Sequence, residues 1–358
     1  MSSRFFRFFP LPSFFTIPTV GLDFSDATMR FIRFREGRHG LLPADYGALS
    51  IPPGCMKEGR IDDEKKFIDF LKGVRKKYGI KYVRVSIPES QVYSFTLPLD
   101  SAAKDDLRGS IELMLEDTIP LKSTEAIFDY QILFTDEKHI LVQVVAISEK
   151  TATAYLDAFA RAGLVPVSFE LDGQAAARAV LRPDDARSCM LVDIGATRTG
   201  ITIITNSIAV YTSTLDFGGA MVVEKIMHER SVSLEEAHRL VHLYGFNAMG
   251  AEAAIVPLLS EVFVTLKEEI NRRYIYWQER KDQFVHLSAI DQIYLCGGYS
   301  TIEGVAEYLS TNLKLPVTAA NPWINCLSFH EVIPLLTQVQ AQSYVTAIGL
   351  ALSDYLYD

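Results

Sequence analysis

Two short segments of the chain place an aspartate at the end of an apolar run. The first is VGLDFSDATMRFIRF, from Val20 to Phe34, and the second is LVDIGATRTGITII, from Leu191 to Ile204. Each predicts two strands joined by a small polar turn. Asp23 and Asp193 are 170 positions apart, which indicates two halves built on one plan. Two such turns can approach a polyphosphate from opposite sides through backbone N–H groups, as at Gly195.

The same two aspartates suit a hydrated cation. Mg²⁺ keeps most of its water shell and needs only one or two carboxylates, so Asp23 and Asp193 can hold it through water. The alternative is that each aspartate binds the amides of its own turn, as in most turns. One hairpin alone favours that alternative, whereas the repeat favours a shared phosphate site.

A third segment fits the same site. CGGYSTIE places Gly297 and Gly298 between a strand and a helix, where a ribose or base can lie against the backbone. A tight strand-to-helix turn is the alternative, and it is equally favoured by this segment alone. Ser300 and Glu303 form a capping-box pattern, which predicts a helix that begins at Thr301.

Other chemistry has weaker support. His238 and His242 lie four apart on a predicted helix, but no third ligand is evident, so a solvated helix face is favoured over a metal site. No Walker A, G-x-S-x-G or G-x-G-x-x-G motif occurs, and we find no nucleophile paired with a base.

Composition narrows the class of protein. The 358 residues carry a formal net charge of −9, which argues against nucleic-acid binding. The four cysteines are scattered, which predicts a cytosolic chain without a disulfide framework. Residues 1–18 are rich in phenylalanine, with Arg4 and Arg7 among them. They predict either a peripheral membrane or partner contact, or a tail that folds onto its own domain.

The elements that must position these residues alternate between strands and helices. Helical spacing is found at 61–78, 100–118, 151–162 and 174–181, and strands are predicted at 81–87, 127–134 and 140–147. Residues 182–188 form a polar linker, and a closing helix is predicted at 343–357. The pattern predicts an α/β protein with domains at 19–187 and 188–358.

These motifs resemble the PilM family of actin-like type IV pilus assembly proteins, within the FtsA, actin and Hsp70 superfamily. The resemblance rests on both hairpins, on EDTIPLKSTEAIFDY, on AGLVPVSFEL, and on CGGYSTIEGVAEYLSTNLKLPVTAANPW. It implies an actin-like (ribonuclease H-like) fold with a subdomain inserted at about 91–163 in the first domain. A mostly helical insertion is implied at about 217–287 in the second domain.

The resemblance also implies a function and its partners. The chain would be a cytoplasmic scaffold, peripheral at the inner membrane, in type IV pilus or related type II secretion assembly. It would bind the cytoplasmic tail of a PilN-like inner-membrane protein in a groove between the first domain's core and its insertion. Other inner-membrane and motor components of the pilus would be further partners. ATP with Mg²⁺ would clamp the two domains, with at most slow hydrolysis.

The residues implied for the nucleotide come from the matching motifs. They are Asp23, Ser25, Asp26, Ala27, Thr28, Asp193, Gly195, Ala196, Thr197, Arg198, Thr199, Gly218, Gly219, His238, Val241, Gly297, Gly298 and Tyr299.

Three departures from the family pattern fall on this set. In the first hairpin, Ser25 replaces a turn glycine and Asp26 adds a charge. In the second insertion, His238 and Val241 stand where the family has Glu and Lys. After the Gly-Gly pair, Tyr299 replaces a third glycine. A serine where φ > 0 is needed costs about 1 kcal/mol, and an added carboxylate repels phosphate. We therefore expect ATP to bind weakly.

Two alternatives stay open at the level of sequence. One is an FtsA-like filament protein, which an exposed amphipathic C-terminal helix would favour; the chain instead ends at LSDYLYD. The other is a small-molecule kinase of the same superfamily, which needs a general base near the γ-phosphate.

Overall fold

A computed structural model describes residues 19–281, 288–328 and 331–356, in two compact units. Of the described residues, unit 1 holds 19–179, 326–328, 331–335 and 346–356, and unit 2 holds 180–281, 288–325 and 336–345. The chain therefore returns to unit 1 at its end, whereas the sequence placed all of 188–358 in the second domain. The Phe-rich segment 1–18 lies outside the described residues.

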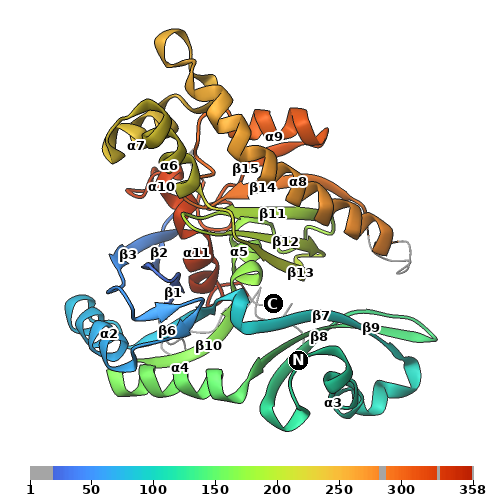
Figure 1. Ribbon diagram of the computed structural model, residues 1–358. Coiled ribbons are helices and arrows are strands. Elements are labelled where there is room, and N and C mark those ends of the chain that lie inside the picture. The colour runs from blue at the N-terminus through green and yellow to red at the C-terminus, as the bar shows by residue number, and fades with distance from the viewer. Residues whose placement is uncertain (1–18, 282–287, 329–330, 357–358) are drawn as a thin grey trace. The chain divides into compact units, whose positions relative to one another are not determined.

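The sheet of unit 1 has five strands in the order β10-β6-β1-β2-β3 (Figure 1). Strands β1, β2 and β3 are antiparallel neighbours, and β6 and β10 run parallel to β1. Their bounds are Val20–Phe24 for β1, Thr28–Gly37 for β2, Gly40–Ser50 for β3, Tyr82–Ile87 for β6 and Val165–Leu171 for β10.

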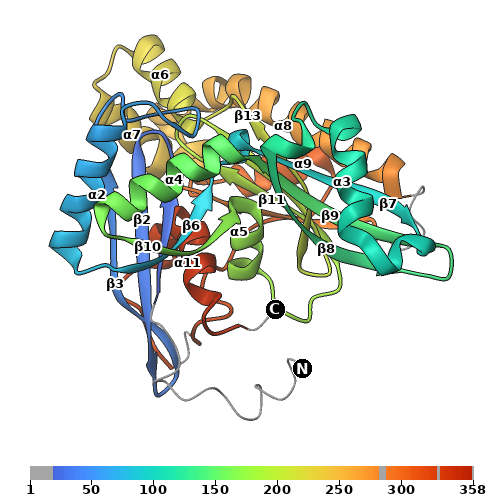
Figure 2. The same ribbon diagram turned by 90° about the horizontal axis from the view of Figure 1, so that it is seen from below.

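Helices α2 (Glu64–Tyr78) and α4 (Glu149–Ala162) pack on this sheet in one apolar core, and they can be followed side by side in Figure 2. Both begin at a side-chain cap and end at a glycine in the left-handed region. Asp63 accepts from the Lys66 N–H at 3.0 Å, and Gly79 has φ of 63°. Gly163 ends α4 with φ of 75°, as the sequence predicted.

Helix α11 (Val345–Leu352) packs against β1 and α5, and a glycine lies at each contact. A Cβ on Gly21 of β1 would lie 2.1 Å from the Ala347 carbonyl oxygen. A Cβ on Gly349 would lie 1.6 Å from the carbonyl oxygen of Ala175, in α5 (Asp172–Val180). Because neither glycine has a side chain, α11 packs directly on the backbone of β1 and of α5.

A small module interrupts unit 1 between β6 and α4. Its sheet has the order β7-β9-β8, and α3 covers one face (Figure 1). The bounds are Val92–Asp100 for β7, Leu107–Thr118 for α3, Ala126–Thr135 for β8 and His139–Ser148 for β9. The predicted hairpin is therefore present. The predicted helix at 100–118 is present only from Leu107, because β7 runs to Asp100 and residues 101–106 form a 3-10 turn.

Unit 2 repeats the strand order of unit 1. Its sheet runs β13-β12-β11-β14-β15, with β11, β12 and β13 antiparallel and β14 and β15 parallel to β11. When the strands of each sheet are counted along the chain, both sheets have the spatial order third, second, first, fourth, fifth. The bounds are Ser188–Ile194 for β11, Thr199–Thr205 for β12, Ile208–Leu215 for β13, Ile290–Cys296 for β14 and Val317–Ala319 for β15.

The segment between β13 and β14 is mostly helical in the described residues. It contains α6 (Gly219–Arg230), α7 (Leu234–Leu243) and α8 (Ile255–Lys281), and α6 contacts both of the others. Residues 282–287 lie outside the described part. No helix in the described ranges is both long and apolar enough to cross a membrane.

Candidate functional site

The first predicted turn, residues 25–28, is closed by its own hydrogen bonds. The Ser25 N–H donates to the Thr28 carbonyl oxygen at 2.8 Å, and the Thr28 N–H donates to Ser25 Oγ at 3.0 Å. Ser25 does not have a positive φ. The expectation that serine is strained here was therefore wrong, because the turn does not need a positive φ at this position. The serine hydroxyl also supplies an acceptor for the turn, which glycine lacks.

Asp26 is also engaged within unit 1. Its two carboxylate oxygens accept the N–H groups of Glu58 at 2.9 Å and Gly59 at 2.8 Å. These residues form the turn between β4 (Met56–Lys57) and β5 (Arg60–Ile61), and both have positive φ, at 52° and 75°. The sequence predicted a carboxylate that repels phosphate, and that stays a prediction. The structure adds that Asp26 holds the β4–β5 turn in place.

Asp23 is the penultimate residue of β1 and is held by β6. Ser86 Oγ donates to Asp23 Oδ1 at 3.0 Å and accepts the Phe24 N–H at 3.2 Å. Burial raises the pKa of Asp23, while the Arg30 guanidinium and the Ser86 hydrogen bond oppose that shift. One oxygen of this carboxylate is therefore already hydrogen-bonded to the neighbouring strand β6.

The second hairpin repeats the first in register. Asp23 pairs with Arg30, and Asp193 pairs with Gly200. Both paired positions therefore recur 170 residues later in the chain. The Gly195 N–H donates to the Arg198 carbonyl oxygen at 3.0 Å, as Ser25 donates to Thr28. A Cβ on Gly195 would lie 2.7 Å from that oxygen, so the turn is tight.

The side chains around this second turn differ in accessibility. Ala196 and Thr197 are exposed, and Arg198 lies 3.8 Å from the Asp216 carboxylate. Thr199 is buried, and its hydroxyl donates to the Phe217 carbonyl oxygen at 2.9 Å. Thr199 was predicted as a ligand residue, but its hydroxyl is used inside unit 2.

The start of α6 is tied to the same turn. The N–H groups of Gly219 and Ala220 donate to the carbonyl oxygens of Gly195 and Ala196, at 3.0 and 2.9 Å. A Cβ on Gly218 would lie 2.2 Å from the Ala196 oxygen. These first amides of α6 are therefore paired with the turn.

The Gly-Gly turn after β14 closes over the end of β11. Gly297 has φ of 89°, and a Cβ there would lie 2.2 Å from Asp193 Oδ1. The Tyr299 N–H donates to the Ile194 carbonyl oxygen at 3.1 Å. The predicted capping box was wrong: Ser300 Oγ donates to the Gly297 oxygen, and α9 (Val305–Leu313) begins after Gly304.

Three rings gather beside this turn. Tyr299 lies 5.2 Å from His242 and 6.4 Å from His238 between ring centroids, and the two imidazoles are stacked at 6.1 Å. A Cβ on Gly219 would lie 1.9 Å from Tyr299 Cγ. The ring of Tyr299 therefore covers the first residue of α6.

Helix α7 places His238, which the sequence assigned to the site, and His242, which it did not, beside Tyr299. Val241 is fully buried, with Ala237 and Leu240, so its side chain is not available to a ligand. His238 and His242 are half-buried against Tyr299, which corrects the solvated-face interpretation. The i, i+3, i+4 spacing of 237, 240 and 241 is the signal that could have placed Val241 in the core. No group of three or more metal-ligating side chains occurs among the residues that the structure describes.

Acid should weaken unit 2 through His242. Burial and the neighbouring His238 lower the pKa of His242, whose Nδ1 lies 3.4 Å from Thr301 Oγ1. A lowered histidine pKa means that the unfolded chain binds the proton first, so stability falls as pH drops below about 6.5. Thermal melts between pH 7.5 and 5 should show a smaller loss for His242→Gln than for the natural protein.

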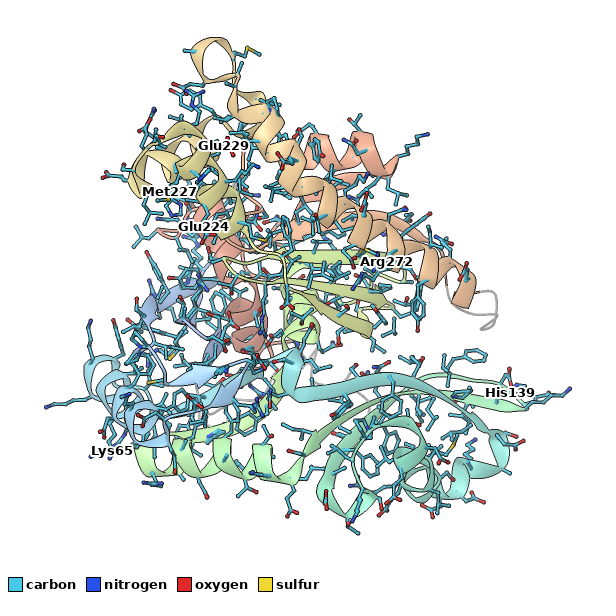
Figure 3. The ribbon with its side chains drawn as sticks, in the orientation of Figure 1. Lys65, His139, Glu224, Met227, Glu229 and Arg272 are labelled. Atoms are coloured by element: carbon cyan, nitrogen blue, oxygen red, sulfur yellow. The ribbon has the colours of Figure 1, made fainter. Side chains whose placement is uncertain are left out.

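His139→Gln is the matched control for that measurement. His139 is an exposed residue at the far end of the β8–β9 hairpin (Figure 3). This variant should keep the acid sensitivity of the natural protein. Equal acid sensitivity of the His242→Gln and natural proteins would refute the role of His242.

The inserted module of unit 1 has its own apolar core, separate from that of the main sheet. Glu116 belongs to the E-x-x-I-P motif, and its Oε1 accepts the Ser123 N–H at 2.9 Å and the Ser123 hydroxyl at 3.0 Å. These bonds lower the pKa of Glu116. Ile119, in the same motif, is buried in the core of the module. The motif therefore fixes the turn between α3 and β8.

Apolar side chains remain exposed on the elements that join this module to the main sheet. Ile127 in β8 is 47% exposed, and it pairs with Ile147, which also pairs with Val92 where the module begins. Leu156 in α4 and Val165 and Val167 in β10 are exposed as well. Strands β8 and β10 are both sheet edges in the described structure.

Comparison with known proteins supports the fold. The sequence model of the family described as "Type IV pilus assembly protein PilM" matches residues 21–355. The chain is similar to a solved "PilM-PilN type IV pilus biogenesis complex", with 21% identity, 95% of this chain and 99% of that chain covered, and a TM-score of 0.76.

More distant structures share the architecture. The ethanolamine utilization protein EutJ from Carboxydothermus hydrogenoformans is 18% identical, with 96% and 91% covered and a TM-score of 0.52. MreB5 of Spiroplasma citri bound to ADP is 13% identical, with 94% and 95% covered and a TM-score of 0.54. These likenesses show an actin-like two-domain fold.

Proposed function

The chain belongs to the PilM family of type IV pilus assembly proteins, and we propose that it is a cytoplasmic scaffold that binds the tail of a PilN-like inner-membrane protein. The family match over residues 21–355 and the likeness to a complex named for PilM and PilN support this proposal. A position at the inner membrane, through that tail, and contacts with further pilus or type II secretion components belong to the same proposal.

The proposal rests on the inserted module of unit 1. Its ten-residue core cluster contains residues of α3, the segment after it and all three strands, and none of the core cluster of the main sheet. A module that packs on itself leaves its edges and outer surfaces for a partner. An extended peptide can bind such a surface through an open strand edge and through pockets for alternate side chains.

We place the tail where the module joins the main sheet. Ile127, Val165 and Val167 are exposed apolar residues on the edge strands β8 and β10, and Leu156 is exposed on α4 between them in sequence. A peptide with alternating apolar residues would bury these side chains while its backbone pairs with a strand edge.

Substitution of Ile127 should separate this surface from the rest of the module. Ile127→Asp should lower the affinity for a tail peptide at least tenfold, because a charge would replace apolar contact. Ile132→Asp is the matched control. Ile132 is in the same strand and is also 47% exposed, but its odd spacing from Ile127 places it on the opposite face, opposite Val142.

Pull-down with the immobilised tail peptide is the measurement. We expect retention of the natural protein and of Ile132→Asp, and loss of Ile127→Asp with an unchanged circular dichroism spectrum. Equal retention of both variants would place the peptide elsewhere. Loss with Ile132→Asp alone would place it on the α3 side of the module.

Support for ATP with Mg²⁺ comes from the turns of the two hairpins, and not from the residues beside the Gly-Gly turn. The turn at residues 25–28 in unit 1 and the turn at residues 195–198 in unit 2 each have exposed residues, which a phosphate can approach. The residues beside the Gly-Gly turn do not fit a base, because the Tyr299 ring covers Gly219. We propose that ATP binds the natural protein weakly.

A further inference from the structure

The carboxyl ends of β11 and β14 in unit 2 are a place where ligands bind in open α/β sheets. Asp193 and Ile194 end β11, and Gly297 and Gly298 follow β14. Glycine at such a strand end normally allows a ligand to approach the backbone. In this chain the next residue, Tyr299, directs its ring over Gly219, at the start of α6.

We propose that Tyr299 is a built-in plug, whose ring fills the space between Gly219 and the two histidines of α7 that a planar base would otherwise occupy. Unit 2 is thereby complete without a nucleotide. This inference does not depend on tail binding, because all of the residues that carry it belong to unit 2.

The plug is anchored through its backbone on both sides. The Tyr299 N–H donates to the Ile194 carbonyl oxygen at 3.1 Å, which ties it to the end of β11. The Ile302 N–H donates to the Tyr299 carbonyl oxygen at 3.4 Å, and Thr301 Oγ1 donates to the Gly298 oxygen at 2.9 Å. The ring therefore projects from a fixed turn.

The residues around Tyr299 leave space for its ring. Gly219 offers a bare Cα, and even a methyl group there would lie 1.9 Å from Tyr299 Cγ. On the other side, the centroid of the His242 ring lies 5.2 Å from that of Tyr299. The Nδ1 atom of His242 lies 3.4 Å from Thr301 Oγ1. Burial lowers the pKa of His242 and raises that of Tyr299, so both rings are neutral near pH 7. A base that enters must displace the Tyr299 ring and its contacts with these neutral neighbours.

Removal of the ring should open the site. Titration of the full chain with ATP and Mg²⁺, followed by calorimetry, should show at least tenfold tighter binding to Tyr299→Gly than to the natural protein. Tyr299→Phe keeps the ring and should bind as weakly as the natural protein. Tight binding by the natural protein, or no gain in Tyr299→Gly when it is folded, would overturn the proposal.

A second measurement does not involve a nucleotide and does not require Tyr299→Gly to fold. Gly219→Ala in the natural protein should lower the melting temperature of unit 2 by several degrees, because the new methyl group meets the ring. In a Tyr299→Ala background the same change should have little effect. An unchanged melting temperature for Gly219→Ala in the natural protein would show that the ring does not lie on Gly219.

Discussion

Gly349→Ala should destabilise unit 1 by about 3 kcal/mol or more, the upper range for an overpacked core. Gly349 lies in α11, and its new Cβ would lie 1.6 Å from the Ala175 carbonyl oxygen of α5. Because that oxygen belongs to the backbone, relief requires movement of a whole helix. Differential scanning calorimetry should show the melting temperature of unit 1 lowered by about 6–12 °C.

Gly73→Ala is the control for this prediction. Gly73 lies inside α2, in the same unit, and a Cβ there would meet nothing within 4 Å. Alanine should stabilise the helix by about 0.5–1 kcal/mol, so the melting temperature should rise slightly. A Gly349→Ala protein as stable as the natural one would mean that α11 does not pack on α5 as described.

Gly297→Ala should have a comparable effect on unit 2. Its φ of 89° is strained for alanine, and the new Cβ would lie 2.2 Å from Asp193 Oδ1 and 2.5 Å from the Ile194 carbonyl oxygen. Backbone strain and the clash together should cost about 3 kcal/mol or more. Hydrogen exchange should show lost protection at the ends of β11 and β14.

The neighbouring Gly298→Ala distinguishes local strain from a general sensitivity of this turn. A Cβ on Gly298 would meet only Ser343 Oγ at 3.6 Å, an ordinary contact. We expect its hydrogen-exchange pattern to match that of the natural protein. Equal loss of protection in both variants would contradict the close approach of Gly297 to Asp193.

The repeat was predictable because each copy is defined by residue types that lie close together in the sequence. An apolar run, an aspartate and a small turn occur at Asp23 and again at Asp193, and both hairpins form in the same register. Alternating apolar residues likewise predicted β8 and β9, and a glycine predicted the end of α4. Each of these features depends on local periodicity or on one turn residue.

Features that depend on distant parts of the chain were not predictable in the same way. The return of the chain to unit 1 after residue 345 depends on contacts with β1 and α5, more than 150 positions away. The role of Asp26 depends on the turn at Glu58 and Gly59. The sequence showed that Tyr299 departs from the family pattern, but only the structure shows that its ring lies over Gly219.

The decisive measurement is calorimetric titration of the natural protein with the cytoplasmic tail peptide of a PilN-like membrane protein. We expect saturable binding of one peptide per chain, with the same affinity in the presence and absence of ATP and Mg²⁺, and loss of this binding in Ile127→Asp. No saturable heat, or heat that appears only when ATP and Mg²⁺ are present, would rule out the proposed scaffold.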